Sequence, residues 1–177
     1  GTKVPQCIID PDLSCIHFPG LFKRTHLLFY KSFISRSIKK SKSLVVFSQY
    51  CKAEIIKHFK KERDKIEVVT CGVNENFHKI SNEEREIVKT KYSGDNEYFV
   101  YTGATVPHEN LINLLKSFSA FKKRQKSAMQ LIIAGKHGFK YEALIESMQS
   151  FKFRQDVKIY EDRSNEQLAQ LTGASYA

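Results

Sequence analysis

The chain has 177 residues, a formal net charge of +10 and 41% hydrophobic residues. This length and hydrophobic content predict a globular protein with one large or two small domains. The charge is uneven, because the segment from Leu13 to Ala53 holds eight Lys or Arg and no Asp or Glu. An anionic partner is therefore expected, and nucleic acid, an anionic membrane surface and a phosphorylated small molecule all fit.

The cysteine and histidine spacings indicate neither disulfides nor a zinc site. The four cysteines form no C-x-x-C pair and show no zinc-like spacing with the six histidines, so we expect buried thiols in the reducing cytoplasm and no metal. The most apolar stretch, residues 27–34, is interrupted by Lys31 and is much shorter than a membrane span. We therefore expect a cytoplasmic protein, with the inner face of the cell membrane as a second possible place.

In the first part of the chain, apolar strand patterns alternate with helical ones. Strands are predicted at residues 4–9, 44–47 and 66–69, and Ser48 is a suitable N-cap for a helix between the last two. Residues 21–42 predict a basic amphipathic helix. Its expected apolar side consists of Phe22, Leu28, Phe29, Phe33 and Ile38.

Residues 73–97 are polar and predict a linker with a single helix. Ser81 and Glu84 have the spacing of a capping box, which sets the start of that helix. Beyond this segment, residues 98–103 form an uninterrupted apolar run, which is typical of a strand buried on both faces.

The second part of the chain predicts a βαβ unit followed by further elements. Its second strand covers residues 129–136, and the apolar stripe of the crossover helix consists of Leu111, Leu114, Leu115, Phe118 and Phe121. A helix at 141–148, a strand at 157–160 and a capped final helix follow. In a parallel sheet, ligands bind beyond the carboxyl ends of the strands, so the site is expected in loops 103–110 and 135–139.

The sequence lacks the motifs of several common enzyme classes. The chain lacks the G-x-S-x-G, G-x-x-x-x-G-K-S/T, H-E-x-x-H and G-x-G-x-x-G patterns, which disfavours an NAD enzyme and a P-loop NTPase. The loop after Gly103 leads into a helix whose N-terminus suits a diphosphate, although a plain turn has the same local pattern. Each unit has only three predicted strands, so both units are expected to be incomplete.

Three stretches in the expected order resemble the family-4 glycosyltransferases with the GT-B fold. The first runs from Ser48 through the strand I-E-V-V to Gly72, the second is Gly103 to Leu111 with its preceding strand, and the third combines residues 131–136 with the helix at 164–174. The resemblance implies two Rossmann-like units with parallel sheets, both incomplete here. Residues 1–77 would end the acceptor-side domain, residues 78–97 would be a linker with one helix, and residues 98–177 would begin the nucleotide-sugar domain.

The resemblance also implies the site residues and a reaction without a cofactor or a required metal. The donor diphosphate would be neutralised by a helix N-terminus and basic side chains. The expected donor-binding residues are Gly103, Ala104, Glu109, Asn110, Lys136 and His137. On the acceptor side, Asp12 follows Pro11 where the family often has histidine and aspartate, and a turn residue is the alternative.

Two positions depart from the family pattern. Ala104 stands where the family has arginine, and Glu109 stands where it has lysine, which places a repulsive carboxylate near the expected diphosphate. Lys136 and His137 on the neighbouring loop are candidates for the missing positive charge, and a solvated turn is their alternative interpretation. The identities of the catalytic residues do not follow from this sequence.

The sequence leaves three functional hypotheses. The first is a glycosyltransferase, with retention expected, that moves a hexose to a cell-envelope glycan or lipid-linked acceptor and is truncated and inactive alone. Under this hypothesis, residues 21–42 would contact anionic membrane lipid. The second is a degenerate, non-catalytic relative, which Ala104 and Glu109 favour. The third is a basic nucleic-acid-binding protein, which no RNP, KH or helix-turn-helix pattern supports.

Overall fold

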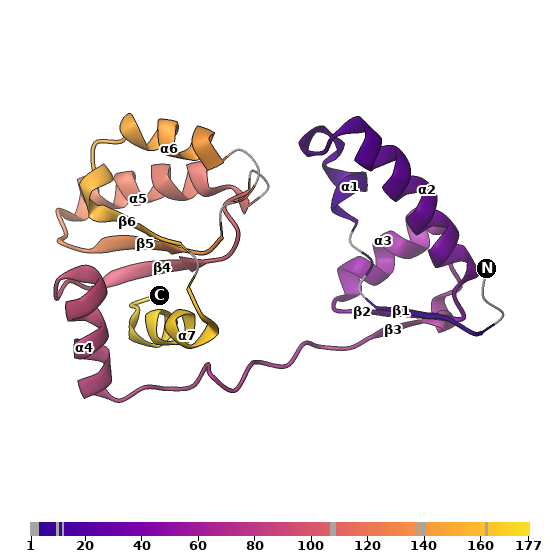
Figure 1. The fold of residues 1–177 in the computed structure, drawn as a ribbon, viewed down its shortest axis with the longest axis horizontal. Coiled ribbons are helices and arrows are strands. Elements are labelled where there is room, and N and C mark those ends of the chain that lie inside the picture. The colour runs from indigo at the N-terminus through magenta and orange to yellow at the C-terminus, as the bar shows by residue number, and fades with distance from the viewer. Residues whose placement is uncertain are drawn as a thin grey trace. The chain divides into compact units, whose positions relative to one another are not determined.

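The computed structural model describes residues 4–9, 11, 13–106, 109–136, 138, 141–161 and 163–177. The chain forms two compact units, Gly1–Gly72 and Val73–Ala177, and each has its own three-stranded parallel sheet (Figure 1). Within the described ranges, no helix has the length and hydropathy that a membrane crossing requires.

The first unit is a parallel sheet in the order β1-β2-β3. Its elements are β1 (Cys7–Ile9), α1 (Ser14–His17), a 3-10 turn (Pro19–Leu21), α2 (Arg24–Lys40), β2 (Ser43–Val46), α3 (Gln49–Phe59), a second 3-10 turn (Arg63–Lys65) and β3 (Ile66–Val68). The predicted N-cap is confirmed, because the Ser48 hydroxyl accepts a hydrogen bond from the Cys51 backbone N–H at 3.0 Å. Ile38, Leu44 and Ile55 are fully buried between the helices and the sheet.

The predicted apolar side of α2 is confirmed at Ile38 and wrong at three other positions. Leu28, Phe29 and Phe33 are 73%, 68% and 59% exposed, and the residues that pack on the core are Ile38 and its neighbour Ile34. At about 100° per residue, Ile34 and Ile38 lie within about 40° of each other, whereas Phe29 and Phe33 fall roughly 100° or more away. The core of the first unit therefore covers the face of α2 that carries Ile34 and Ile38, and the face that carries Phe29 and Phe33 is exposed.

The second unit has the sheet order β4-β5-β6. Its elements are α4 (Asn82–Ser93), β4 (Tyr98–Thr102), α5 (Leu111–Gln125), β5 (Gln130–Ala134), α6 (Tyr141–Gln149), a 3-10 turn (Arg154–Asp156), β6 (Val157–Tyr160) and α7 (Asn165–Ala174). Both predicted capping boxes are present, at Ser81 with Glu84 and at Ser164 with Gln167. Helices α4 and α7 cover one face of the sheet, and α5 and α6 cover the other (Figure 1).

Helix α4 belongs to the second unit, although the sequence placed it in a linker. Val88 and Tyr92 on α4 are buried in the same core as Tyr98 and Leu171. The Tyr160 hydroxyl also donates a hydrogen bond to the Tyr92 carbonyl at 2.8 Å. Although the sequence of α4 is mostly polar, its narrow apolar stripe is enough to anchor the helix, because α4 packs on the core with only one side.

After α7 the chain returns to β4 on the side opposite β5. The Tyr176 backbone N–H donates to the Tyr98 carbonyl at 2.8 Å, and the Val100 N–H donates to the Ala177 carbonyl at 2.9 Å. Strand β4 therefore has β5 on one side and residues 176–177 on the other. Such a point, where the strand order reverses, is where open α/β sheets bind ligands beyond their carboxyl ends.

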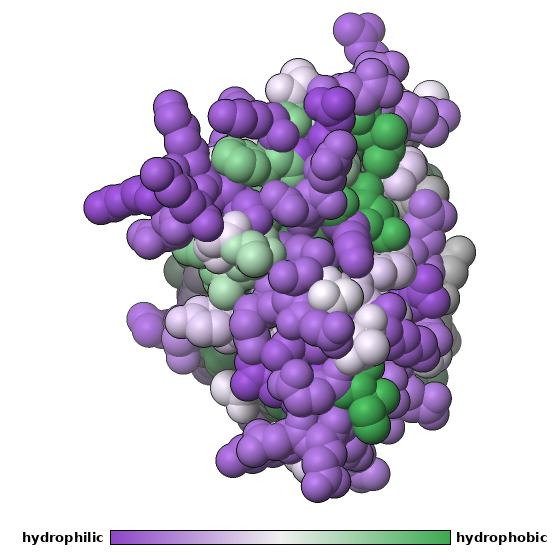
Figure 2. All heavy atoms as spheres, turned by 90° about the vertical axis from the view of Figure 1, so that its left-hand side faces the viewer, coloured by the Kyte–Doolittle hydropathy of each residue, from purple (hydrophilic) through white to green (hydrophobic). Residues whose placement is uncertain are grey.

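The second unit presents a largely polar face (Figure 2). Figure 2 shows one face of the molecule on which hydrophilic side chains predominate and hydrophobic ones form separate small patches. The core side chains Leu131, Ile132 and Ile133 of the central strand are at most 1% exposed. The apolar residues that predicted this strand are thus buried in the core of the unit.

The Tyr98 hydroxyl links β4 to α7 and gives a prediction on stability. Tyr98 is fully buried, and its hydroxyl donates to the Leu171 carbonyl at 2.7 Å. The change Tyr98→Phe leaves that carbonyl without its partner, so we expect a loss of about 1–3 kcal/mol in the free energy of unfolding. Urea unfolding followed by circular dichroism measures it, with the 65% exposed Tyr176→Phe as control. Equal midpoints for the two variants would contradict the assignment.

The same residue gives a dependence on pH. Burial, reinforced by the nearby Glu97 and Tyr92, raises the pKa of Tyr98 well above its usual value despite the opposing charge of Arg85. Above roughly pH 10, the unfolded chain loses a proton that the folded chain keeps, so stability falls as the pH rises. We expect a smaller alkaline loss of stability in Tyr98→Phe than in the wild type. An identical pH profile in urea titrations would show that other groups control it.

Candidate functional site

Two loops meet at the carboxyl edge of the second sheet. Gly103 follows β4, and its backbone N–H donates to the Ala134 carbonyl at 3.1 Å. Two residues further on, the Thr105 N–H donates to the Lys136 carbonyl at 3.1 Å. The loop after β4 and the loop after β5 are therefore held side by side beyond the strand ends.

This contact requires glycine in both loops. A Cβ atom on Gly135 would lie 1.8 Å from the Gly103 carbonyl oxygen, and one on Gly138 would lie 2.2 Å from the Val106 Cγ1. Gly103 has a φ of +152°, a backbone conformation that other residues rarely adopt. The glycines that ended the two predicted strands thus allow the backbones to approach closely.

Thr105 holds the two loops together through its side chain. It is only 4% exposed, and its hydroxyl accepts from the Gly138 N–H at 3.1 Å and donates to the Lys136 carbonyl at 3.3 Å. Sequence reasoning missed this residue, because a threonine in a loop has no distinctive spacing. Its hydroxyl matches the two backbone groups only once the loops are adjacent.

Helix α5 begins directly after the first loop without a side-chain cap. Its N-cap is Asn110, whose φ of 60° is left-handed and whose side chain makes no capping hydrogen bond among the described residues. The Asn110 Oδ1 instead accepts from the Asn113 Nδ2 at 2.8 Å. The first turn carries no acidic residue, so its backbone N–H groups and the positive end of the helix dipole suit an anion.

Glu109 lies beside a tyrosine. The Tyr101 hydroxyl is at 3.0 Å from the Ala104 carbonyl, to which it donates. Burial and then the charge and hydrogen bonding of Glu109 raise the pKa of Tyr101 to about 12. The carboxylate therefore has a neighbour within its own loop, which the sequence did not indicate.

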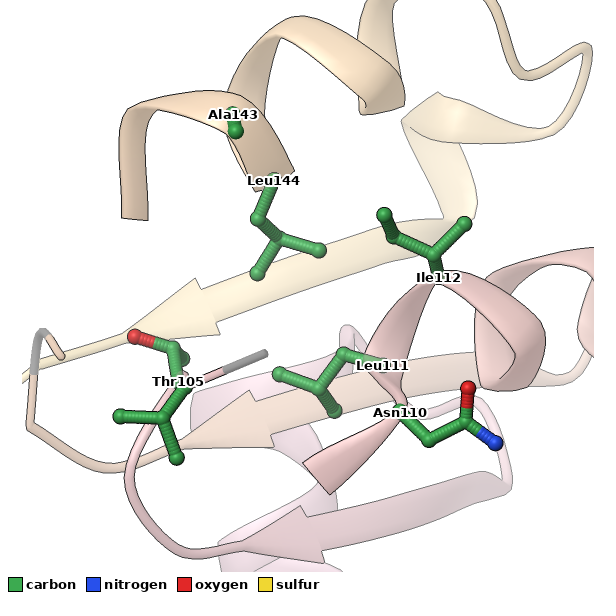
Figure 3. Close-up of a pocket in the computed structure, with 7 residues that line it drawn as sticks. Thr105, Asn110, Leu111, Ile112, Ala143 and Leu144 are labelled. Carbon is green, nitrogen blue, oxygen red and sulfur yellow. The ribbon is translucent and has the colours of Figure 1, made fainter. Parts of the chain in front are cut away.

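A pocket of about 200 Å³ opens next to these loops (Figure 3). It lies among the loop after β4, the start of α5 and helix α6. Figure 3 shows Leu111 and Leu144 facing the space between α5 and α6, with Thr105 and Asn110 at its border. Its remaining lining residues are Val106, Ile112 and Ala143. The pocket is lined mainly by apolar side chains, and Thr105 and Asn110 are its polar lining residues.

The structure brings together several of the predicted site residues. Gly103, Ala104 and the exposed Lys136 lie in the two adjoining loops, and Glu109 and Asn110 form the entry to α5. His137 and Asp12 lie outside the described residues. The role of each residue in binding remains a prediction.

Comparison with known proteins identifies related families and folds. A family model described as glycosyl transferases group 1 matches residues 82–176. The search of curated proteins found no match. Several solved structures share the fold at low sequence identity, and they confirm the expected GT-B type of two parallel α/β units.

Three of these structures show the extent of the likeness. HepE of Anabaena, solved with UDP and glucose, has a TM-score of 0.75 at 16% identity, and the match covers 97% of this chain and 44% of HepE. WaaG, a glycosyltransferase involved in lipopolysaccharide biosynthesis, has a TM-score of 0.77 at 14% identity, with 98% and 50% covered. A glycosyltransferase from Rickettsia africae has a TM-score of 0.61 at 20% identity, with 87% and 40% covered. The chain thus spans half or less of each relative.

The contact between the loops can be tested with a single methyl group. The change Gly135→Ala puts a Cβ into the Gly103 carbonyl, so we expect a loss of at least about 1–3 kcal/mol in unfolding free energy and displaced loops. Urea unfolding measures the loss. Gly72→Ala is the matched control, because a Cβ there would meet no atom within 4 Å. If both variants were as stable as the wild type, the close approach of the loops would be wrong.

Proposed function

Because the chain belongs to the glycosyl transferases group 1 family, we propose that the protein transfers a hexose from a nucleotide-sugar donor to a cell-envelope glycan or a lipid-linked acceptor. The proposed donor site is the carboxyl edge of the second sheet. The observation that carries it is the uncapped start of α5 directly beyond the contact of the two loops. HepE, which shares the fold, was solved with UDP and with UDP-glucose.

The proposed role of this edge is to neutralise the leaving diphosphate. Backbone N–H groups at the start of α5 are fixed donors, and fixed donors need no reorganisation as negative charge develops. Gly103 has no side chain, so the backbone can come close to a phosphate. Lys136 on the adjoining loop is exposed and supplies a mobile positive charge. These groups would act without a metal, and retention at the sugar carbon is proposed from the family resemblance.

Glu109 decides how well this site would bind an anion. Its carboxylate neighbours the Tyr101 hydroxyl, which can donate to only one acceptor at a time and already has the Ala104 carbonyl within 3.0 Å. The negative charge of Glu109 at the helix start would repel a diphosphate bound there. The proposed enzyme would bind its donor more weakly than one with a lysine at this position.

This gives a prediction on nucleotide affinity. The change Glu109→Lys replaces a repulsive charge with an attractive one beside the proposed diphosphate, and we expect UDP binding to strengthen by roughly 1–3 kcal/mol. The gain should shrink as salt is added. Titration calorimetry with UDP and GDP measures it in the full-length protein.

The matched control for this experiment is Glu83→Lys, which makes the same change of charge in the first turn of α4. It should leave UDP affinity unchanged. Equal affinities of the wild type and Glu109→Lys at low salt would contradict the donor-site assignment of this loop.

The exposed face of α2 supports an acceptor at an anionic membrane. Phe29 and Phe33 stack with ring centroids 5.7 Å apart, and they line a shallow groove with Leu28, Ser32 and Arg36. The surrounding sequence, with eight basic and no acidic residues from Leu13 to Ala53, favours anionic lipid headgroups electrostatically. Apolar side chains on a basic helix are typical of segments that lie in the membrane interface.

Membrane contact through α2 is tested by sedimentation with lipid vesicles. We expect binding to vesicles that contain phosphatidylserine but not to pure phosphatidylcholine, and a loss of binding in Phe29→Ser/Phe33→Ser because the apolar contact is removed. The control is Tyr50→Ser, which changes a 67% exposed aromatic residue of α3. Unchanged binding of the double variant, or binding to RNA alone, would contradict this part of the proposal.

A further inference from the structure

Three side chains that could ligate a metal converge in the first unit. His17 is the last residue of α1, and Glu54 and His58 lie one turn apart on α3. The Glu54 Oε2 is 3.3 Å from the His17 Nε2 and 3.2 Å from the His58 Nε2. One ligand atom from each residue can be chosen so that all three lie within 4.8 Å of one another.

One ring nitrogen of this cluster lacks a hydrogen bond among the described residues. The His17 Nε2 is shielded from solvent, yet it makes no hydrogen bond among the described residues, because its approach to the carboxylate has poor geometry. The side chain of Glu54 is only 11% exposed. A buried ring nitrogen that faces a carboxylate oxygen without bonding to it is unusual, and a shared positive ligand would satisfy both groups.

Two of the three spacings between ligand atoms match those of a tetrahedral metal site, and the third lies within 4.8 Å. Zinc binds imidazole nitrogen and carboxylate oxygen at about 2.0–2.2 Å, so two ligand atoms of a tetrahedral site lie roughly 3.3–3.5 Å apart. The two observed spacings of 3.3 and 3.2 Å are close to this value. The two imidazole rings lie edge to face at 85° with centroids 5.7 Å apart, an arrangement that leaves both Nε2 atoms near the same oxygen.

We propose that His17, Glu54 and His58 bind a Zn²⁺ ion, with the fourth position open to water. Two imidazoles and one carboxylate are the ligand types that zinc accepts, whereas calcium and magnesium prefer more oxygen ligands. Lys57 does not block the site, because its Nζ pairs with the other carboxylate oxygen, Oε1, at 3.3 Å and its side chain is 69% exposed.

The ion would connect α1 to α3. Helix α1 has only four residues, and His17 is the last of them. A ligand that binds the folded unit and not the unfolded chain raises the stability of the folded state by mass action. Zinc should therefore stabilise the first unit, and this effect does not depend on the proposed donor site.

The test uses the metals themselves as probes. Titration calorimetry with zinc chloride should show one site per chain and a raised melting temperature. Substitution with Co²⁺ should give the intense visible absorption of a four-coordinate site without the thiolate charge-transfer band that the exposed Cys7 and Cys71 would produce. A thiolate band, or no binding at one equivalent, would overturn the proposal.

Three variants assign the ligands. Each of His17→Ala, Glu54→Gln and His58→Ala should weaken zinc binding about tenfold or more and abolish the cobalt spectrum. The control His78→Ala removes an exposed histidine outside the cluster and should bind as the wild type does. Circular dichroism of each metal-free variant establishes that it is folded. Folded ligand variants that bind zinc with unchanged affinity would refute the site.

Discussion

The approach of the Gly103 carbonyl to Gly135 is the constraint on which the second unit depends. No side chain fits between these two backbones, since even a Cβ on Gly135 would lie 1.8 Å from the carbonyl oxygen. The contact fixes the loop after β4 against the loop after β5, and the buried Thr105 hydroxyl secures it. The start of α5, which has no side-chain cap among the described residues, follows this loop at the carboxyl edge of the sheet.

The rest of the second unit is arranged around this edge of the sheet. Residues that follow α7 return to the free side of β4, so the neighbours of β4 are reached in opposite directions. Helix α4 covers the face on which α7 lies and completes its core. The fold thus places one uncapped helix start where the strand order reverses, and the family match over residues 82–176 covers these elements.

Sequence patterns predicted the strands and capped helices well, because continuous apolar runs and capping residues act locally. They were misleading for α2 and α4, where the choice of buried face depends on the partner. Five aromatic or aliphatic residues between positions 22 and 38 suggested one apolar side, yet Ile38 is the only one of the five that is buried, and Phe29 is exposed. Thr105 and the group of His17 with Glu54 were missed for the same reason: their partners are distant in sequence and adjacent only after folding.

We propose that the start of α5 and the adjoining loops bind a nucleoside diphosphate. Amide chemical shifts in a nuclear magnetic resonance titration with UDP test it residue by residue. We expect the largest shifts at the amides of Ala104, Thr105, Leu111 and Ile112, with Lys136 also affected, and saturation with a single affinity. Shifts confined to other parts of the chain, or none at all at saturating UDP in the full-length protein, would contradict it.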